Sequence, residues 1–151
     1  MEIWKDVIGY EGYYQVSSHG RVKRLETTVK ANKGGTMVVK ERILAPRITK
    51  YGYSRIKLCK YNVEKNIFAH RLVANAFMTN PNGYRVVNHK DGNKLNNHIS
   101  NLEWCTHKEN IIHAIEIGLI DMDKKRAAAS INGKKTVHNI HGWNKKLVQV
   151  S

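Results

Sequence analysis

The sequence predicts an α+β fold: a small strand–loop–strand–helix core, a β-hairpin or small-sheet module before it, and a basic helical segment after it. Two observations predict this order. Short stretches with a two-residue apolar period alternate with turn residues as far as Ala69, and apolar side chains then take up helical spacing. Two more strand patterns and a second helix pattern follow. We expect three regions, at residues 1–48, 49–118 and 119–151.

The N-terminal module is predicted from residues 1–26. Residues 13–16 (YYQV) predict a short strand, residues 17–20 (SSHG) a turn, and residues 21–25 (RVKRL) a second strand with a period of two. Together these residues predict a small hairpin with basic residues on one face. Residues 27–42 hold two adjacent glycines among lysines, and they predict a loop or a hairpin excursion.

Three short strands are expected next, over residues 43–46, 53–58 and 66–69. The middle stretch alternates Tyr, Ile and Leu with Ser, Arg and Lys, so one face is expected to be buried and the other basic. Helical spacing over residues 70–77 then ends before the breaker Asn-Pro-Asn-Gly at residues 80–83.

The core is predicted by the second half of the chain. Strand patterns at residues 85–89 and 102–105 are followed by a helix pattern. Thr106 is a candidate N-cap for this helix, because Glu109 stands at the third helical position and completes a capping box. Gly118 is the expected end of the helix.

The positive charge of the chain is spread along its whole length. Lys and Arg total 26 against 12 acidic residues, a net charge of +14, which divides into +5, +4 and +5 over residues 1–50, 51–118 and 119–151. Such a surface suits an extended polyanion, because Lys and Arg on phosphates release condensed counterions. A DNA-binding protein and a ribosomal or RNA-coating protein both fit, and charge alone does not separate them.

Composition also disfavours some classes of protein. No apolar run approaches the roughly 20 residues that a membrane-spanning helix needs, and the N-terminus lacks the layout of a signal peptide. We therefore expect a cytoplasmic protein without a membrane partner. Cys59 and Cys105 form no CxxC pair, so a structural zinc site and zinc-dependent chemistry have little support.

One histidine and three asparagines carry the functional prediction. Asn88-His89 stands at the end of an apolar strand, Asn101 opens the run NLEW, and Asn110 lies on the following helix. An imidazole titrates near neutral pH and can act as a general base, whereas amide oxygens are ligands for hard cations. In outline this is a hydrolytic metal site, although a single histidine at a strand end is more often structural.

The stretch VVNHKDGNKLNNHISNLEWCTHKEN resembles the His-Asn-His (HNH) endonucleases, in particular the phage and intron branch with Asn as the third motif residue. The N-terminal stretch IWKDVIGYEGYYQVSSHGRVKRL resembles the nuclease-associated modular domain that often precedes such cores. The resemblance implies a ββα-metal (His-Me finger) core and a homing-type DNA endonuclease that leaves 5′-phosphate and 3′-hydroxyl ends. One site per chain implies a monomer that nicks double-stranded DNA, inside a bacterial host cell.

The resemblance also assigns roles to the motif residues. It makes His89 the base that activates water and Asn101 the residue that ties the loop between the strands. It makes Asn88 and Asn110 the ligands of one Mg²⁺ or Mn²⁺. Many relatives have Asp at the first ligand position, and two neutral ligands bind a cation weakly without DNA. His113 either reaches the metal or scissile phosphate, as a further candidate catalytic residue, or is a solvated or core-edge histidine.

The DNA-binding surface is expected on the N-terminal hairpin, on the core and on the basic C-terminal segment, where Asp121 opens a last basic helix. Arg71 and Lys94 either stabilise the transition state or bind the DNA backbone, and His107 is a candidate phosphate contact. Asp91 more often makes a turn than binds a metal. The predicted DNA-binding residues are Arg21, Lys23, Arg24, Arg55, Lys57, Arg71, Lys94, His107, Lys124, Lys125, Arg126, Lys134 and Lys135.

Two other functions compete with this interpretation. A catalytically inactive, sequence-specific DNA-binding protein on the same scaffold is the main alternative, and the intact set of His89, Asn88 and Asn110 argues against it. An RNA-binding or ribosome-associated protein would need aromatic stacking platforms, whereas the tyrosines here fall in strands and turns without that pattern.

Overall fold

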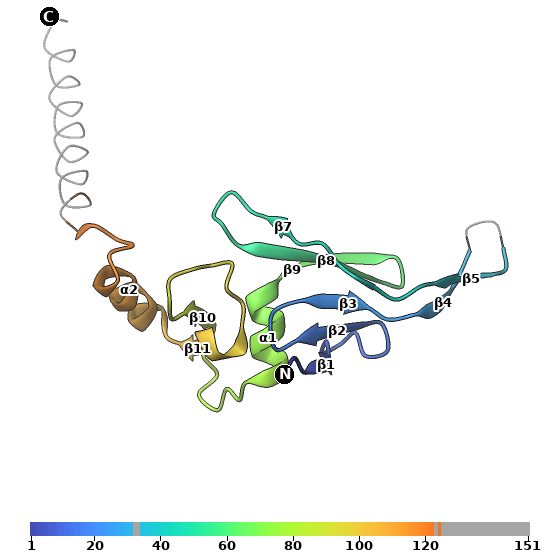
Figure 1. Ribbon diagram of the computed structural model, residues 1–151, viewed down its shortest axis with the longest axis horizontal. Coiled ribbons are helices and arrows are strands. Elements are labelled where there is room, and N and C mark those ends of the chain that lie inside the picture. Colours follow the sequence, from blue (N-terminus) through green and yellow to red (C-terminus); the bar gives the residue numbers. More distant parts are fainter. Residues whose placement is uncertain (32–33, 123, 125–151) are drawn as a thin grey trace, which may run out of the picture. The chain divides into compact units, whose positions relative to one another are not determined.

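The computed structural model describes residues 1–31, 34–122 and 124 (Figure 1). The chain divides into two compact units, Met1–Asn110 and Ile111–Ser151. Strands and helices mix in the described residues, which confirms the predicted α+β class. Most of the predicted basic helix after Asp121 lies outside the described residues, as do Lys125, Arg126, Lys134 and Lys135.

Short strands make up most of the first unit, and the second helix crosses into the second unit. The strands are β1 (Trp4–Asp6), β2 (Tyr14–Ser17), β3 (Val22–Arg24), β4 (Thr27–Lys30), β5 (Thr36–Val39), β6 (Arg42–Ile43), β7 (Arg47–Ile48), β8 (Ser54–Lys60), β9 (Val63–Phe68), β10 (Val86–His89) and β11 (Leu102–Cys105). The helices are α1 (Ala69–Phe77), the single 3-10 turn η1 (Ile99–Asn101) and α2 (His107–Glu116).

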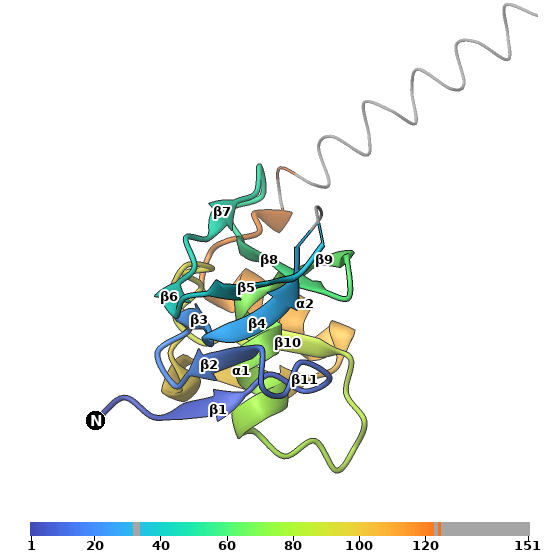
Figure 2. The ribbon, with the colours of Figure 1, turned by 90° about the vertical axis from the view of Figure 1, so that its right-hand side faces the viewer.

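The strands form four small antiparallel sheets. One has four strands in the order β1-β2-β3-β6, and another has three in the order β7-β8-β9. Strands β4 and β5 pair as a hairpin, as predicted for residues 27–42, and β10 pairs with β11. Helix α1 contacts strands of both larger sheets and of the β10–β11 hairpin, so it joins three of the four sheets (Figures 1 and 2).

One hydrophobic core holds the first unit together. Val16 and Val22 come from the N-terminal sheet, Leu58 from β8, Val73 from α1 and Leu102 from β11, and all are buried. Burying apolar surface from several elements at once is what stabilises a unit built of such short strands. The core therefore draws on both sides of the boundary predicted at residues 48 and 49, and that boundary stays a prediction.

The observed elements differ from the predicted ones mainly at sheet edges. Strands β1 and β7 were not expected, and the strand expected over residues 43–46 is confined to Arg42–Ile43. Pro46 has no backbone N–H to donate, so pairing cannot continue through it. Edge strands of two or three residues are too short to show an alternating pattern. Among the described residues, no helix combines the length and apolar character that crossing a membrane requires.

Candidate active site

The β10–β11 hairpin brings the motif residues of both strands side by side. Its register pairs Asn88 with Glu103 and His89 with Leu102. Asn88 and His89 are buried, with 7% and 5% of their surface exposed. Val87 of β10 and Leu102 of β11 anchor the hairpin in the core, so the polar end of β10 is held in a fixed place.

The side chain of Asn97 holds the ring of His89. Its Oδ1 lies 3.2 Å from His89 Nε2, and its Nδ2 donates to the backbone oxygen of Leu95 over 3.0 Å. A backbone carbonyl can only accept, so the amide nitrogen must face Leu95 and the amide oxygen must face the imidazole. His89 Nε2 therefore carries the proton, and Nδ1 keeps its lone pair. This is the tautomer that leaves Nδ1 free to act as a base.

Aromatic rings enclose the other side of His89. The ring of His70 meets it edge to face, with 5.1 Å between centroids, and the ring of Tyr53 lies 6.2 Å away. Burial lowers the pKa of His89, and the hydrogen bond that His89 donates to Asn97 and the charge of Asp91 oppose that effect only in part. Burial, together with the neighbouring His89, lowers the pKa of His70 to about 4. Both imidazoles are thus neutral at neutral pH.

Glu103 fixes the orientation of the Asn88 side chain. Asn88 Nδ2 donates to Glu103 Oε1 over 2.8 Å. An ionised carboxylate has no proton to donate, so only the nitrogen end of the amide can face it. Asn88 Oδ1 consequently points away from Glu103 and is available to a cation. The carboxylate also adds a negative charge beside this neutral side chain.

Asn101 ties the loop between β10 and β11. Its Nδ2 donates to Asp91 Oδ1 and to the backbone oxygen of Asn96, both over 2.8 Å, and its Oδ1 accepts from the N–H of Asp91. Asp91 in turn accepts from the N–H of Asn93, as a turn-forming residue does. Hydrogen bonds to Asn96 and Asn101 hold the pKa of Asp91 below its usual value. The loop that carries Asn97 is therefore closed by side-chain hydrogen bonds.

Helix α2 follows β11 directly and carries Asn110. The predicted capping box is present: the N–H of Glu109 donates to Thr106 Oγ1 over 3.2 Å, and Glu109 Oε2 accepts from the N–H of Thr106 over 2.8 Å. His107 is exposed in the first turn of the helix. His113 lies on the same helix but in the second unit, and its predicted role stays a prediction.

Several predicted DNA-binding residues are already paired within the protein. Arg21 forms a bidentate ion pair with Glu2, and this pair holds the pKa of the Glu2 carboxyl at about 2. The ammonium of Lys57 lies 2.7 Å from the carboxylate of Glu64. An exposed pair of this kind contributes little to stability, so phosphate can replace the acid as the partner of the cation. Two further ion pairs are Lys23 with Glu41, at 3.7 Å, and Lys124 with Asp121, at 3.4 Å.

Other predicted contacts lie near the site or line a concave surface. Lys94 Nζ donates to the backbone oxygen of Tyr51 over 3.1 Å and lies 4.8 Å from the centre of the Tyr53 ring. Arg71 donates to the backbone oxygen of Arg85, and Arg24 lies over the ring of Tyr14. A hollow of about 320 Å³ is lined by the basic residues Arg42, Arg47, Arg55 and Lys57. The sequence singled out only the last two of these four residues.

Four residues of the site were missed by the sequence interpretation: Asn97, Glu103, His70 and Tyr53. Asn97 is one of several asparagines in its loop, and the sequence does not show which of them reaches His89. Glu103 could have been found, because pairing two strands of equal length places it opposite Asn88. Within the described residues, no three His, Cys, Asp or Glu side chains group as a metal site.

Comparison with known proteins shows the family of the chain. The family model described as HNH endonuclease matches residues 68–111, and the NUMOD4 motif matches residues 2–59. The chain is similar to DNA endonuclease I-HmuI of Bacillus phage SP01, with 39% identity over 134 residues, 89% of this chain and 70% of that protein. A solved structure described as DNA binding and cleavage by the HNH homing endonuclease I-HmuI matches with a TM-score of 0.68 and 39% identity, over 87% of this chain and 68% of that one.

Two relatives extend well beyond the matched region. A putative HNH homing endonuclease derived from the SPbeta prophage of Bacillus subtilis (strain 168) is 42% identical over 88 residues, 56% of this chain and 51% of that protein. An uncharacterised HNH endonuclease of Acanthamoeba polyphaga mimivirus is 51% identical over 75 residues, 50% of this chain but 23% of that protein. With its ββα elements, its motif residues and these matches, the chain belongs to the HNH endonuclease family.

Proposed function

We propose that the protein is a homing-type, metal-dependent DNA endonuclease, which hydrolyses a phosphodiester bond to leave 5′-phosphate and 3′-hydroxyl ends. The observation that carries the proposal is the buried imidazole of His89, which Asn97 holds in one tautomer beside Asn88, whose side chain donates to Glu103 of the next strand. The similarity to I-HmuI, and to the structure described as showing its DNA binding and cleavage, supports DNA as the substrate.

His89 is the general base in this proposal. Its Nδ1 accepts a proton from the attacking water, while Nε2–H stays bonded to Asn97 Oδ1 and keeps the ring aligned. Burial lowers the pKa of His89, so the unprotonated form is the one present at neutral pH. The positive charge that forms on the ring after proton transfer is stabilised by the nearby Asp91 carboxylate, which also opposes the effect of burial on this pKa.

Asn88 and Asn110 would hold one Mg²⁺ or Mn²⁺. The donor set fits a hard cation, because both side chains offer amide oxygens and Glu103 turns that of Asn88 away from the neighbouring strand. When bound, the cation would act as a Lewis acid on the leaving oxygen. Neutral ligands bind divalent cations weakly, so we expect DNA phosphates to complete the site.

The positive charge of the chain binds the substrate. Double-stranded DNA is the proposed partner, and Arg55, Lys57, Arg71, Lys94 and His107 are proposed phosphate contacts. With one site per chain, a monomer cuts one strand in each encounter, so nicking is the expected outcome. We place this activity in the cytoplasm of a bacterial host, and His113 remains a candidate contact of the scissile phosphate.

A supercoiled-plasmid assay tests the function. Wild type is expected to convert the plasmid to open circles in Mg²⁺ or Mn²⁺ and not in EDTA, and His89→Ala is expected to lower the rate by about a hundredfold or more. Gel-shift binding of both proteins in EDTA serves as the control for folding and DNA affinity. Equal cutting by His89→Ala and wild type would contradict the role of His89. DNA binding by both proteins without cutting, on a plasmid carrying the specific target, would favour the inactive DNA-binding protein.

A further inference from the structure

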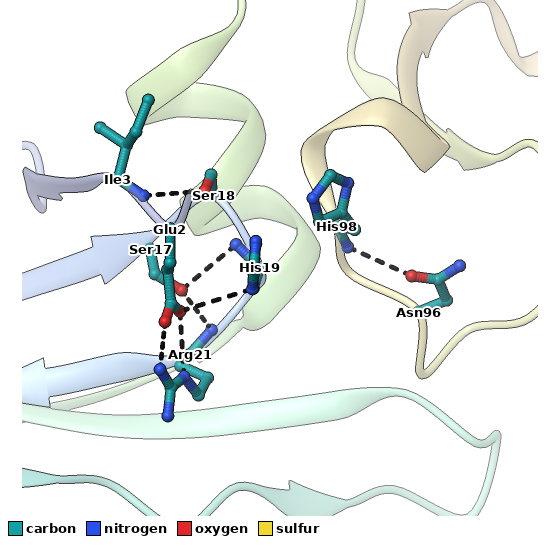
Figure 3. A network of polar contacts seen from close by, with 8 residues as sticks. All are labelled: Glu2, Ile3, Ser17, Ser18, His19, Arg21, Asn96 and His98. Carbon is teal, nitrogen blue, oxygen red and sulfur yellow. Dashed lines mark hydrogen bonds and ion pairs between the residues drawn. The ribbon is translucent and has the colours of Figure 1, made fainter.

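A turn of the N-terminal sheet packs against the loop that carries Asn97. This turn, residues 18–20, joins β2 to β3, and its Ser18 carbonyl accepts a hydrogen bond from the N–H of Ile99 over 2.9 Å. Figure 3 shows His19 of the turn and His98 of the loop, whose ring centroids are 4.8 Å apart with the ring planes tilted by 43°. The 18–20 turn therefore contacts the β10–β11 loop, which lies about eighty residues later in the sequence, next to Asn97.

The 18–20 turn is itself rigidly held. The N–H of Ser18 donates to the backbone oxygen of Ile3 over 2.8 Å, and Ser18 Oγ accepts from the N–H of Ile3 over 3.1 Å (Figure 3). Ser17 is fully buried, and its Oγ accepts from the N–H groups of His19 and Arg21. The buried polar groups of the turn are thus satisfied by hydrogen bonds, which fixes its position relative to β1.

Gly20 stands where the turn leaves no room for a side chain beside the loop. Its φ is +85°, and a Cβ added to it would lie 2.5 Å from Asn97 Cβ and 3.1 Å from the backbone oxygen of Asn97. Only glycine accepts both this backbone conformation and this contact without strain. Asn97 has 6% of its surface exposed, so it has little space into which it can retreat.

Asn97 connects this contact to the base. Its Oδ1 is the hydrogen-bond partner of His89 Nε2, at 3.2 Å. A shift of Asn97 would lengthen this bond, and the imidazole would lose both its tautomer and its alignment. Small misplacements of a catalytic group cost large factors in rate, because near-attack geometry is lost.

We propose that the 18–20 turn positions the catalytic base, with Gly20 setting the place of Asn97 and Asn97 setting the ring of His89. The inference rests on the proposed role of His89. In this view the N-terminal sheet contributes to the chemical step as well as to DNA binding. Gly20 and Asn97 are positioning residues, since they act through His89 and do not touch the scissile phosphate.

Gly20→Ala, with Gly9→Ala as its matched control, tests the proposal. Gly9 has nearly the same φ, +81°, but a Cβ added to it would meet nothing within 4 Å, so this variant carries the backbone strain without the clash. Single-turnover nicking under saturating enzyme should slow by about tenfold or more in Gly20→Ala relative to Gly9→Ala. The Kd for the same DNA in EDTA should stay within about twofold, because binding surfaces are unchanged. Equal nicking rates for the two folded variants would overturn the proposal.

A second pair of variants keeps the test decisive if Gly20→Ala fails to fold. Asn97→Asp retains an oxygen acceptor for His89 Nε2–H, whereas Asn97→Leu has none. We expect Asn97→Asp to nick faster than Asn97→Leu, with equal DNA affinity. Equal rates for these two folded variants would contradict the role of Asn97. Adding Gly20→Ala to Asn97→Leu should slow nicking no further, because Gly20 acts only through the hydrogen bond between Asn97 and His89, which Asn97→Leu has already removed.

Nitrogen-15 NMR of the His89 ring gives a readout that does not need activity. Wild type and Gly9→Ala should show one tautomer with the proton on Nε2, and Gly20→Ala should show a mixture of tautomers. A pure Nε2–H tautomer in Gly20→Ala would overturn the proposal. His89→Ala distinguishes a failure of the proposed role of His89 from a failure of the proposed role of Gly20. If it nicks as fast as wild type, the proposed role of His89 fails, and the positioning proposal fails with it; if it is inactive while Gly20→Ala matches Gly9→Ala, only the positioning proposal fails.

Discussion

His70 is a buried histidine whose protonation would lower the stability of the fold. It has 6% of its surface exposed and stacks on Phe68 as well as meeting His89, so a charge on it would lie among aromatic rings. Its folded-state pKa of about 4 lies below the unfolded value of 6.5. The unfolded chain therefore binds more protons between these two pH values, and the stability of the fold falls as the pH drops through them.

As the pH falls from 6.5 to 4, protonation of His70 is expected to lower the free energy of unfolding by up to about 3 kcal/mol. His70→Phe keeps a ring in this place and removes the titrating group, so its stability should change less over the same range. Urea unfolding of both proteins at several pH values measures the difference. Parallel pH profiles for the two proteins would show that His70 is not the titrating group.

Glu103 should set the cation requirement of the enzyme. In Glu103→Gln the new amide can either donate or accept, so it no longer fixes which end of Asn88 faces the metal site. Outer-shell changes of this kind typically cost about tenfold or more in metal affinity. We expect the Mg²⁺ concentration for half-maximal nicking to rise by about that factor, with unchanged DNA binding in EDTA. Glu26→Gln removes the same charge from an exposed position and should leave the Mg²⁺ titration as in wild type.

For single residues, the sequence predicted which residues belong to the site better than it predicted which side chains they contact. His89, Asn88 and Asn101 stand out in the sequence because their spacing forms a motif. The contact of Asn97 with His89 depends on how the loop closes, and the contact of His70 depends on the packing of α1 against the hairpin. Neither is encoded by a local period or a turn signal.

Among the elements, α2 depends most on local interactions. None of its described side chains is fully buried, so tertiary packing contributes less to it than to α1, which has five buried residues. Its capping box was predictable because Thr and Glu three residues apart form a local signal. The two-residue strand β7 was not, since it forms by pairing with its longer neighbour β8.

Thr106→Ala should loosen the helix that carries Asn110. Loss of the cap is expected to destabilise α2 by about 1 kcal/mol, because the N–H of Glu109 loses its acceptor. Amide hydrogen exchange in the first turn of α2 measures the effect, which should appear as faster exchange there. Thr106→Ser keeps the hydroxyl and is the matched control. Unchanged exchange in Thr106→Ala would show that the cap does not stabilise this helix.

On the scale of the molecule, the distribution of the core was the least predictable feature. Alternating patterns predicted a buried face only over residues 53–58, where Ile56 and Leu58 are buried, as are Val16 and Val22 of the N-terminal sheet. They did not indicate that these residues would meet in a single cluster. Antiparallel hairpins fold from local signals, whereas the assembly of hairpins around α1 is set by long-range packing.

The shared core limits how such nucleases can be recombined. A chimera that replaces residues 1–48 by another DNA-binding module also removes Val16 and Val22, which pack with Leu58, Val73 and Leu102. The nuclease half would then expose apolar surface that it normally buries, and aggregation is the usual result of such exposure. New target specificity is therefore better sought by changing exposed side chains of the N-terminal sheet than by exchanging it whole.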